Sequence, residues 1–186
     1  MGIRICLLLI FLSFSNFAQK VKWASQVISV SSEYKDALLG KEFRALHALG
    51  RPSKYPKMSI TPSAWQSMTP DSPEGEYLLV EFDTTMSVKQ IAIFENYGAG
   101  SITSVEGLDQ NNKIYPLKTF SPGYPTSSSQ VTSIRLPVKT SFKLKGLKMT
   151  IGWNFPSTSC VSTIFSALRF PLPSPINSSV LTEKTR

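Results

Sequence analysis

The sequence predicts an all-β protein: an antiparallel β-sandwich of the jelly-roll type with one short helix. Three observations support this fold. About eight segments have the apolar patterning or β-branched content of strands, segments rich in proline, glycine and serine separate several of them, and only one segment has helical spacing. The chain has 186 residues, which is enough for one domain to bury a core without metals or disulfides.

The clearest alternation is in Tyr77–Asp83, where every second residue is apolar. One face carries Leu78, Val80 and Phe82, and the other carries Glu81 and Asp83. A period of two is typical of a strand with one buried face. We expect this strand to end in a turn at Thr84–Ser87.

The next segments complete a central stretch, Tyr77–Leu108. Val88–Phe94 is apolar on both faces, which is typical of a strand in the middle of a packed sheet. Gly98 and Gly100 tolerate a turn, and Ser101–Leu108 is assigned as a strand from its β-branched residues. We therefore expect three successive strands in the middle of one sheet.

The remaining elements follow from weaker patterns. Further strands are expected at Val21–Ser31, Lys113–Phe120, Val131–Val138, Phe142–Ile151 and Val161–Phe170. Within Phe142–Ile151 the apolar phase slips at Gly146, which predicts a β-bulge. Leu38, Phe43, Leu46 and Leu49 recur at roughly helical spacing, but Gly40 interrupts them. This predicts a short helix near Glu42–Ala48.

The N-terminus resembles an export signal. Met1–Ala18 holds Arg4, then the apolar run Ile5–Phe14, which is too short to span a bilayer, and ends in a small residue. We expect cleavage after Ala18, a binding module over residues 19–170, and a disordered tail over 171–186. The protein would then be periplasmic, on the outer-membrane surface, or secreted. The alternative is a buried N-terminal core helix.

Charge and cysteine content restrict the partners. The formal net charge is +8, and loss of Arg4 with the leader lowers it by one. A basic balance favours anionic glycans, lipid headgroups or nucleic acid, although a basic soluble surface explains it equally well. Export argues against nucleic acid, and peripheral association with a membrane or envelope is compatible with it. Without Cys6, Cys160 is the only cysteine, so no internal disulfide is expected.

The sequence offers little for catalysis or metal binding. His47 is the single histidine, so a catalytic dyad or triad and a zinc site lack their usual residues. Asp71, Glu74 and Glu76, with Ser72, could supply oxygen ligands to a structural calcium ion. The alternative is a solvated acidic loop. We expect no cofactor.

Binding candidates are aromatic and polar residues in the expected loops. Aromatic rings stack on sugar rings or apolar ligands, and nearby polar groups fix the ligand's orientation. The candidates are Arg51, Tyr55, Trp65, Glu95, Asn96, Tyr97, Trp153 and Asn154. Trp65 could instead close one end of the core.

A lysine-rich face is a second candidate surface. Lys139, Lys143, Lys145 and Lys148, with Arg135, lie in or near two expected strands. They could meet an anionic surface. Lysines on an edge strand also prevent sheet-to-sheet aggregation, which is the alternative.

Several segments together resemble one family. They are Trp23–Val27, Ser31–Tyr34, Ala45–Pro52 (ALHALGRP), Ala64-Trp65, Glu76–Phe82 (EYLLVEF), Ile91–Gly100 (IAIFENYGAG) with Ile102 and Val105, and Phe165–Phe170 (FSALRF). The chain thereby resembles the discoidin-type, galactose-binding-like modules of exported Gram-negative proteins, including those that precede outer-membrane-protein-A-like domains. The resemblance covers most of Trp23–Phe170 and implies a jelly-roll sandwich with binding loops at one end and a non-catalytic role.

The chain departs from that family at its last strand, where Ser166 stands in place of the family's usual aspartate. The sequence-based hypothesis is an exported, non-enzymatic module that recognises a glycan, an envelope component or a partner protein. The alternative is a structural accessory subunit of a surface or adhesion assembly. A glycan-processing enzyme is a third hypothesis, which would need two carboxylates facing each other across a cleft.

Overall fold

The computed structural model describes residues 21–53, 57, 60–69, 72, 74–121, 130–136, 140–152 and 164–169. The elements in this part are β1 (Val21–Val30), β2 (Tyr34–Asp36), β3 (Lys41–Phe43), the 3₁₀ helix η1 (Ala45–Ala48), β4 (Glu76–Met86), β5 (Gln90–Glu95), β6 (Ile102–Asp109), β7 (Ile114–Thr119), β8 (Gln130–Arg135), β9 (Leu144–Ile151) and β10 (Ile164–Arg169). No helix among these residues is long and apolar enough to cross a membrane. The expected leader and tail, residues 1–18 and 171–186, lie outside the described residues.

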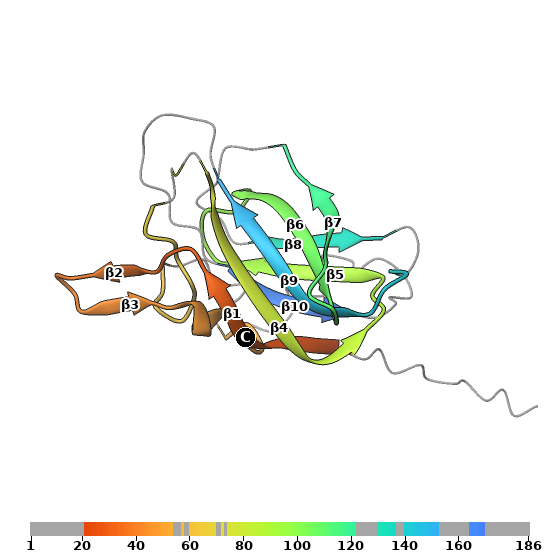
Figure 1. Ribbon diagram of the computed structural model, residues 1–186. Helices are drawn as coiled ribbons and strands as arrows, with labels where there is room; N and C mark the ends of the chain where they lie inside the picture. Colours follow the sequence, from red (N-terminus) through yellow and green to blue (C-terminus); the bar gives the residue numbers. More distant parts are fainter. Residues whose placement is uncertain are drawn as a thin grey trace, which may run out of the picture.

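Eight strands form two layers that share β1. Their order is β7-β6-β9-β4-β1-β10-β5-β8, and every pair is antiparallel. Residues Val21 to Trp23 of β1 pair with β10, and Ala24 to Val30 pair with β4. In Figure 1, β4, β6 and β9 cross in front of β5, β8 and β10. The sheet thus folds over at β1 into the predicted antiparallel β-sandwich with jelly-roll architecture.

The central stretch is distributed over both layers. β4 and β6 belong to the front layer, whereas β5 lies between β10 and β8 in the back layer. The three strands do belong to one eight-stranded sheet, but no two of them are neighbours in it and they do not together form its middle, as was expected. Consecutive strands of a sandwich can lie in opposite layers, and the alternation within a strand does not reveal its neighbours.

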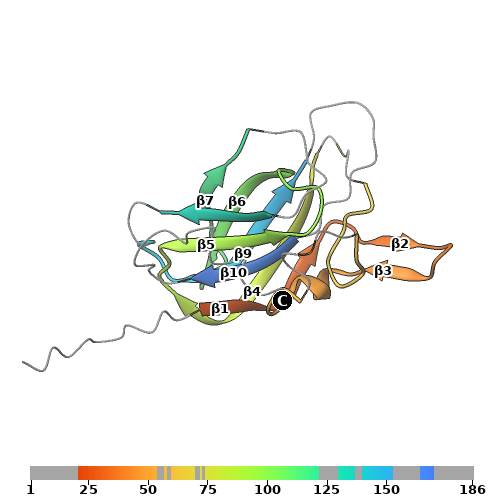
Figure 2. The ribbon, with the colours of Figure 1, turned by 180° about the vertical axis from the view of Figure 1, so that it is seen from behind.

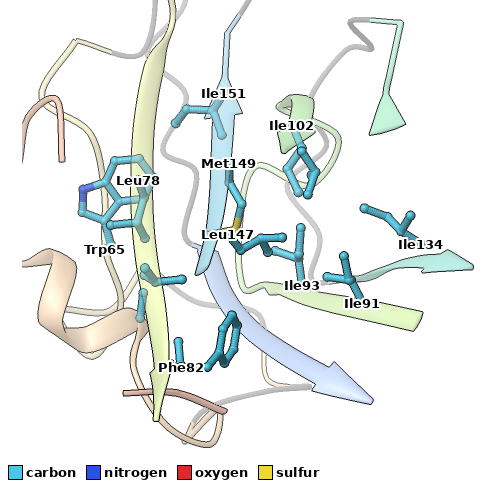
Figure 3. Close-up of a cluster of buried hydrophobic side chains, with 14 of the residues drawn as sticks. Trp65, Leu78, Phe82, Ile91, Ile93, Ile102, Ile134, Leu147, Met149 and Ile151 are labelled. Atoms are coloured by element: carbon cyan, nitrogen blue, oxygen red, sulfur yellow. The ribbon is translucent and has the colours of Figure 1, made fainter. Parts of the chain in front are cut away.

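The core lies between the two layers. Leu78, Val80 and Phe82 of β4 are buried, as predicted, and they cluster with Ile91 and Ile93 of β5. Figure 3 shows Leu78, Phe82, Ile91 and Ile93 together with side chains of β9, namely Leu147, Met149 and Ile151. The other face of β5 is also buried, because Ala92 and Phe94 pack with Ala64 and the half-buried Trp23. The prediction that β5 is apolar on both faces because both are covered is confirmed.

The predicted irregularity at Gly146 is present in β9. Leu108 of β6 pairs with Gly146, but the next residue, Asp109, pairs with Leu144, so Lys145 is skipped. This extra residue shifts the inward phase along β9. A Cβ atom on Gly146 would lie 2.6 Å from the carbonyl oxygen of Val80, so only glycine allows β4 to approach this closely.

One local prediction is wrong, because β4 continues to Met86 and there is no turn at Thr84–Ser87. The short helix expected near Glu42–Ala48 is present as the single-turn η1, Ala45–Ala48, while the start of the expected range belongs to β3. β3 pairs with β2 in a hairpin, and the carboxylate of Asp36 accepts hydrogen bonds from the backbone N–H groups of Leu38 and Leu39, both 3.0 Å. This turn replaces the helical hydrogen bonds that the apolar spacing suggested.

The sandwich has two unlike ends. At the long-loop end, β1 leads to β4 through residues 31–75, β5 leads to β6 through 96–101, β7 leads to β8 through 120–129, and β9 leads to β10 through 152–163. At the short-turn end, the connections are 87–89, 110–113 and 136–143. The β2–β3 hairpin projects from the side opposite the start of β1 in both Figure 1 and Figure 2.

Candidate functional site at the long-loop end

The sequence-predicted binding residues come from three parts of the chain. Arg51, Tyr55 and Trp65 lie between β1 and β4, Glu95 to Tyr97 lie where β5 ends, and Trp153 and Asn154 follow β9. Of these positions, the strand order places Glu95, Asn96 and Tyr97 at the long-loop end. Tyr55, Trp153 and Asn154 lie outside the described residues, so the structure shows the surroundings of the other five alone.

Trp65 is a residue of the core and does not reach the surface. Its side chain is 0% exposed and belongs to the main core cluster with Ala45 and Ala48 of η1. The indole Nε1–H donates a hydrogen bond of 2.9 Å to the carbonyl oxygen of Ser32. Figure 3 shows the ring at the edge of the core beside Leu78. Because a fully buried ring cannot stack on a sugar, the core role considered from the sequence is the one that the structure shows.

A buried carboxylate holds the start of the long connection. Glu76 is buried and accepts hydrogen bonds from the hydroxyl groups of Ser31 and Ser32. The Ser32 hydroxyl oxygen also accepts the N–H of Met68, 2.9 Å away. Glu76 is therefore engaged by protein groups. Of the other residues suggested for calcium, Glu74 is exposed and Asp71 lies outside the described residues. No cluster of three or more His, Cys, Asp or Glu residues capable of holding a metal occurs in the described part.

The turn between β5 and β6 presents an aromatic side chain on a braced backbone. Tyr97 is half-buried, whereas Glu95 and Asn96 before it are fully buried. Glu95 accepts hydrogen bonds from the Gly100 N–H, at 3.2 Å, and from the Thr132 hydroxyl, at 2.6 Å. The Ser101 hydroxyl donates to the Gly98 carbonyl oxygen. Glu95 thus fixes the turn from below, and the partly accessible Tyr97 is the side chain that can contact a ligand.

Glycine makes this turn possible. Gly98 and Gly100 adopt φ values of 69° and 99°, in the region where side chains with a Cβ atom are strained. The Gly152 N–H, just after β9, donates a hydrogen bond of 3.1 Å to the Ser101 carbonyl oxygen. This bond ties the end of β9 to the end of the Tyr97 turn.

Several buried polar atoms at the long-loop end lack hydrogen-bond partners. Within the described residues, these atoms are His47 Nδ1, Gln66 Oε1, Ser67 Oγ and both polar atoms of the Asn96 side chain. All four residues belong to the connections at this end. Buried polar groups are ordinarily paired, so this concentration distinguishes the long-loop end chemically from the rest of the described molecule.

Arg51 lies in the connection from β1 to β4, shortly after η1. It is exposed and follows Gly50, whose N–H donates a hydrogen bond of 2.9 Å to the Ala24 carbonyl oxygen of β1. The backbone before Arg51 is therefore anchored to the sandwich, while its guanidinium group remains accessible to solvent.

The sequence did not reveal the β2–β3 hairpin. Leu38 and Leu39 at its tip are 97% and 64% exposed. Leu38 shares a roughly helical spacing with Phe43, and the contrary signals were Gly40, which interrupts that spacing, and Asp36, four residues before it. Asp and Gly favour turns, and Gly40 has a φ of 62°.

Two lysines of the lysine-rich face form ion pairs with carboxylates. Lys145 forms an ion pair of 3.3 Å with Glu81, and Lys148 forms one of 3.5 Å with Glu106. β9 lies between β6 and β4, so the idea that these lysines protect an edge strand is wrong. Lys143 is exposed, and Lys139 lies outside the described residues.

Comparison with known proteins identifies the fold. No protein-family model matches the chain, and no curated protein sequence matches it. Among solved structures, reduced XRCC1 bound to the DNA polymerase β catalytic domain matches with a TM-score of 0.60 at 11% identity, covering 82% of this chain and 100% of that chain. The family 32 carbohydrate-binding module of Streptococcus pneumoniae EndoD gives 0.52 at 10% identity, over 78% and 95%.

The family 32 module of C. perfringens NanJ, in complex with galactose, gives a TM-score of 0.50 at 14% identity, over 81% of this chain and 93% of that chain. At such identities the likeness concerns the fold. The expected link to outer-membrane-protein-A-like proteins finds no support in these comparisons. The chain has the β-sandwich jelly-roll fold of the family 32 carbohydrate-binding modules.

Proposed function

We propose that the protein is a non-catalytic glycan-binding module that uses its long-loop end. The observation that carries this proposal is the braced turn that presents Tyr97 at the end where the long connections meet. The fold adds support, because solved modules of this fold include one in complex with galactose.

In this proposal, one side chain stacks on the sugar ring, and polar groups orient the sugar by hydrogen bonds. The Tyr97 ring supplies an apolar face for a sugar ring, and its hydroxyl and the Arg51 guanidinium supply hydrogen bonds. Glu95 holds the Tyr97 turn in place before the ligand arrives, which lowers the entropy lost on binding. Trp153 and Asn154, predicted from the sequence, are the residues we expect to add a second contact.

A glycan array followed by calorimetry tests the proposal. We expect Tyr97→Ala to weaken binding of the best array ligand by roughly tenfold or more, because the stacking face is lost. The matched control is Tyr115→Ala, which removes a half-buried tyrosine from the short-turn end and should leave glycan affinity unchanged. Retained affinity in a folded Tyr97→Ala protein, or an array without ligands, would refute this function.

The β2–β3 hairpin supports a second candidate function, that of an accessory subunit in a surface assembly. Its exposed tip leucines are suited to enter an apolar site on another protein. Crosslinking in the native host should then give a defined product with the wild type that is lost in Leu38→Ser/Leu39→Ser. Glycan affinity should be unchanged in that variant, which separates the two functions.

Export is a further element of the proposal. The positive residue, apolar run and small residue of Met1–Ala18 support removal of this leader. We expect the secreted protein to begin at Gln19, which its intact mass would verify. A protein that retains Met1 after secretion would contradict the proposed cleavage.

A further inference from the structure

The short-turn end gathers basic residues that few acidic residues oppose. Its strand ends and turns carry Lys22, Lys89, Lys113, Arg135, Lys143 and Arg169 on the basic side, and Asp83 and Asp109 on the acidic side. The chain as a whole has 20 basic and 12 acidic residues. The ratio of basic to acidic residues is therefore higher at the short-turn end than in the whole chain.

Both acidic residues at this end are already engaged. Asp83 pairs with Lys22 at 2.9 Å. Asp109 is buried: one carboxylate oxygen accepts the N–H groups of Asn111 and Lys113, and the other accepts the Tyr115 hydroxyl. The Lys113 charge also acts on Asp109, although its side chain is exposed. Lys89 and Lys143 are exposed and form no ion pair with a carboxylate of the described residues, so their charge is available to an external anion.

The basic residues lie on both layers. In the back layer, Arg135 of β8 and Arg169 of β10 both pair in register with Gln90 of β5. Their backbones therefore lie on either side of Gln90, about 10 Å from each other. Lys89 precedes Gln90, and its carbonyl oxygen accepts the Leu136 N–H at 2.9 Å. This register places three cationic positions at one edge of the back layer.

In the front layer, the basic residues surround apolar side chains. Tyr115 and Phe142 stack with ring centroids 4.1 Å apart, and Lys113 Nζ lies 5.1 Å from the Tyr115 ring centroid. Lys143 follows Phe142 and is exposed. Ile114, beside Lys113, is 46% exposed. Cations next to a partly exposed isoleucine and tyrosine form a surface with both charged and apolar parts.

The geometry points to the short-turn end as a docking surface for a membrane with anionic lipid headgroups. Its cations occupy turns and strand ends of both layers, so they can meet a plane at many points at once, whereas a linear polyanion favours a continuous row. Lysine and arginine near an anionic leaflet each add attraction, and tyrosine and aliphatic side chains are favoured at the headgroup boundary. The proposal is independent of glycan binding.

Docking through the short-turn end would fix the orientation of the protein relative to the membrane. The short-turn end would lie against the headgroups, so the long-loop end, with Tyr97, would point away from the membrane into solution. Glycan binding and membrane docking would thus use opposite ends and would not compete.

Flotation of the purified protein with lipid vesicles tests the inference. The vesicles contain about one third phosphatidylglycerol, or phosphatidylcholine alone, in roughly 0.1 M salt. We expect binding to the anionic vesicles alone and its loss in roughly 0.5 M salt. The triple variant Lys89→Glu/Lys113→Glu/Lys143→Glu should partition about a hundredfold less.

The matched control is Lys41→Glu/Lys57→Glu/Lys118→Glu, which changes the net charge equally at exposed positions away from the short-turn end. It should change partitioning by less than about tenfold, because distant charges are screened. Thermal unfolding confirms that both variants are folded. Equal losses in the two variants, or no wild-type binding to anionic vesicles, would overturn the proposal. Binding to a soluble acidic polysaccharide that is tighter than binding to vesicles would instead assign the surface to that polymer.

Discussion

The two ends of the sandwich are held together by different means. At the long-loop end, residues far apart in sequence support one another: Trp65 enters the core and donates to Ser32, and Glu95 joins Gly100 to Thr132. At the short-turn end, the Asp109 turn is satisfied by residues within six positions. One end depends on the packed interior, and the other depends mainly on local hydrogen bonds.

This difference affects how each surface can change. A binding surface that is held by contacts between residues far apart in sequence is rigid, but mutations in the core will damage it. Charges displayed on locally stable turns can be exchanged with little effect on the fold. The unpaired buried polar atoms follow the same division, because they occur at the long-loop end within the described residues.

The largest effect is expected from Trp65→Ala. The substitution leaves a cavity beside η1 and removes the hydrogen bond to Ser32, so we expect a loss of about 3–5 kcal/mol in the free energy of unfolding. Urea denaturation measures it. The control Phe142→Ala removes a half-buried ring at the short-turn end and should cost roughly 1–2 kcal/mol. A smaller loss of unfolding free energy for Trp65→Ala than for Phe142→Ala would contradict the view that the long-loop end depends more strongly on the packed interior.

An intermediate effect is expected from Glu95→Ala. The change leaves the Gly100 N–H and the Thr132 hydroxyl without this acceptor, at a cost of about 1–3 kcal/mol in unfolding free energy. It should also weaken glycan binding, because the Tyr97 turn loses its support. Glu81→Ala, which breaks the partly exposed pair with Lys145, should cost less than about 1 kcal/mol. Unchanged stability in Glu95→Ala would show that the hydrogen bonds of Glu95 do not stabilise the Tyr97 turn.

The smallest effect concerns Asp109 and pH. Burial alone would raise the pKa of this carboxyl, but the Lys113 and Asn111 N–H groups, the Tyr115 hydroxyl and the Lys113 charge hold the pKa below its ordinary 3.8. A group whose pKa is lower in the folded state stabilises the fold above its unfolded pKa and loses this contribution as the pH falls through the folded value.

Urea unfolding of the wild type and Asp109→Asn from pH 7 downward measures this contribution. We expect the wild type to be the more stable protein near neutral pH, and the two stabilities to converge below pH 3.8. A constant difference across that range would show that the charge of Asp109 does not stabilise the turn.

The strands were predictable because alternation reports burial directly. Leu78, Val80 and Phe82 face the core as their spacing indicated, and the glycine at the phase slip of β9 marks a real irregularity. The pairing of β4, β5 and β6 was not predictable, since apolar patterning shows which face is buried but not which strand lies alongside.

The candidate site was predictable only in part. Strand order places Tyr97 at the long-loop end, whereas the backbone before Arg51 is hydrogen-bonded to Ala24, near the start of β1. The sequence did not show that Glu95 and Asn96 are buried. Glu95 continues the alternation of Ile91 and Ile93 toward the core, but a charged side chain there is usually interpreted as exposed. Leu38 is the opposite case, an apolar residue that the Asp36 turn holds in solvent.

The pairing of Val21 with Arg169 has a practical consequence. Because these two positions are direct neighbours on β1 and β10, a short peptide linker could join them and allow circular permutation, with new termini opened at an exposed turn. Fusion partners attached at Val21 or Arg169 would emerge beside the lysines and leave Tyr97 unobstructed, which makes these positions the natural choice for immobilising the protein on a sensor chip.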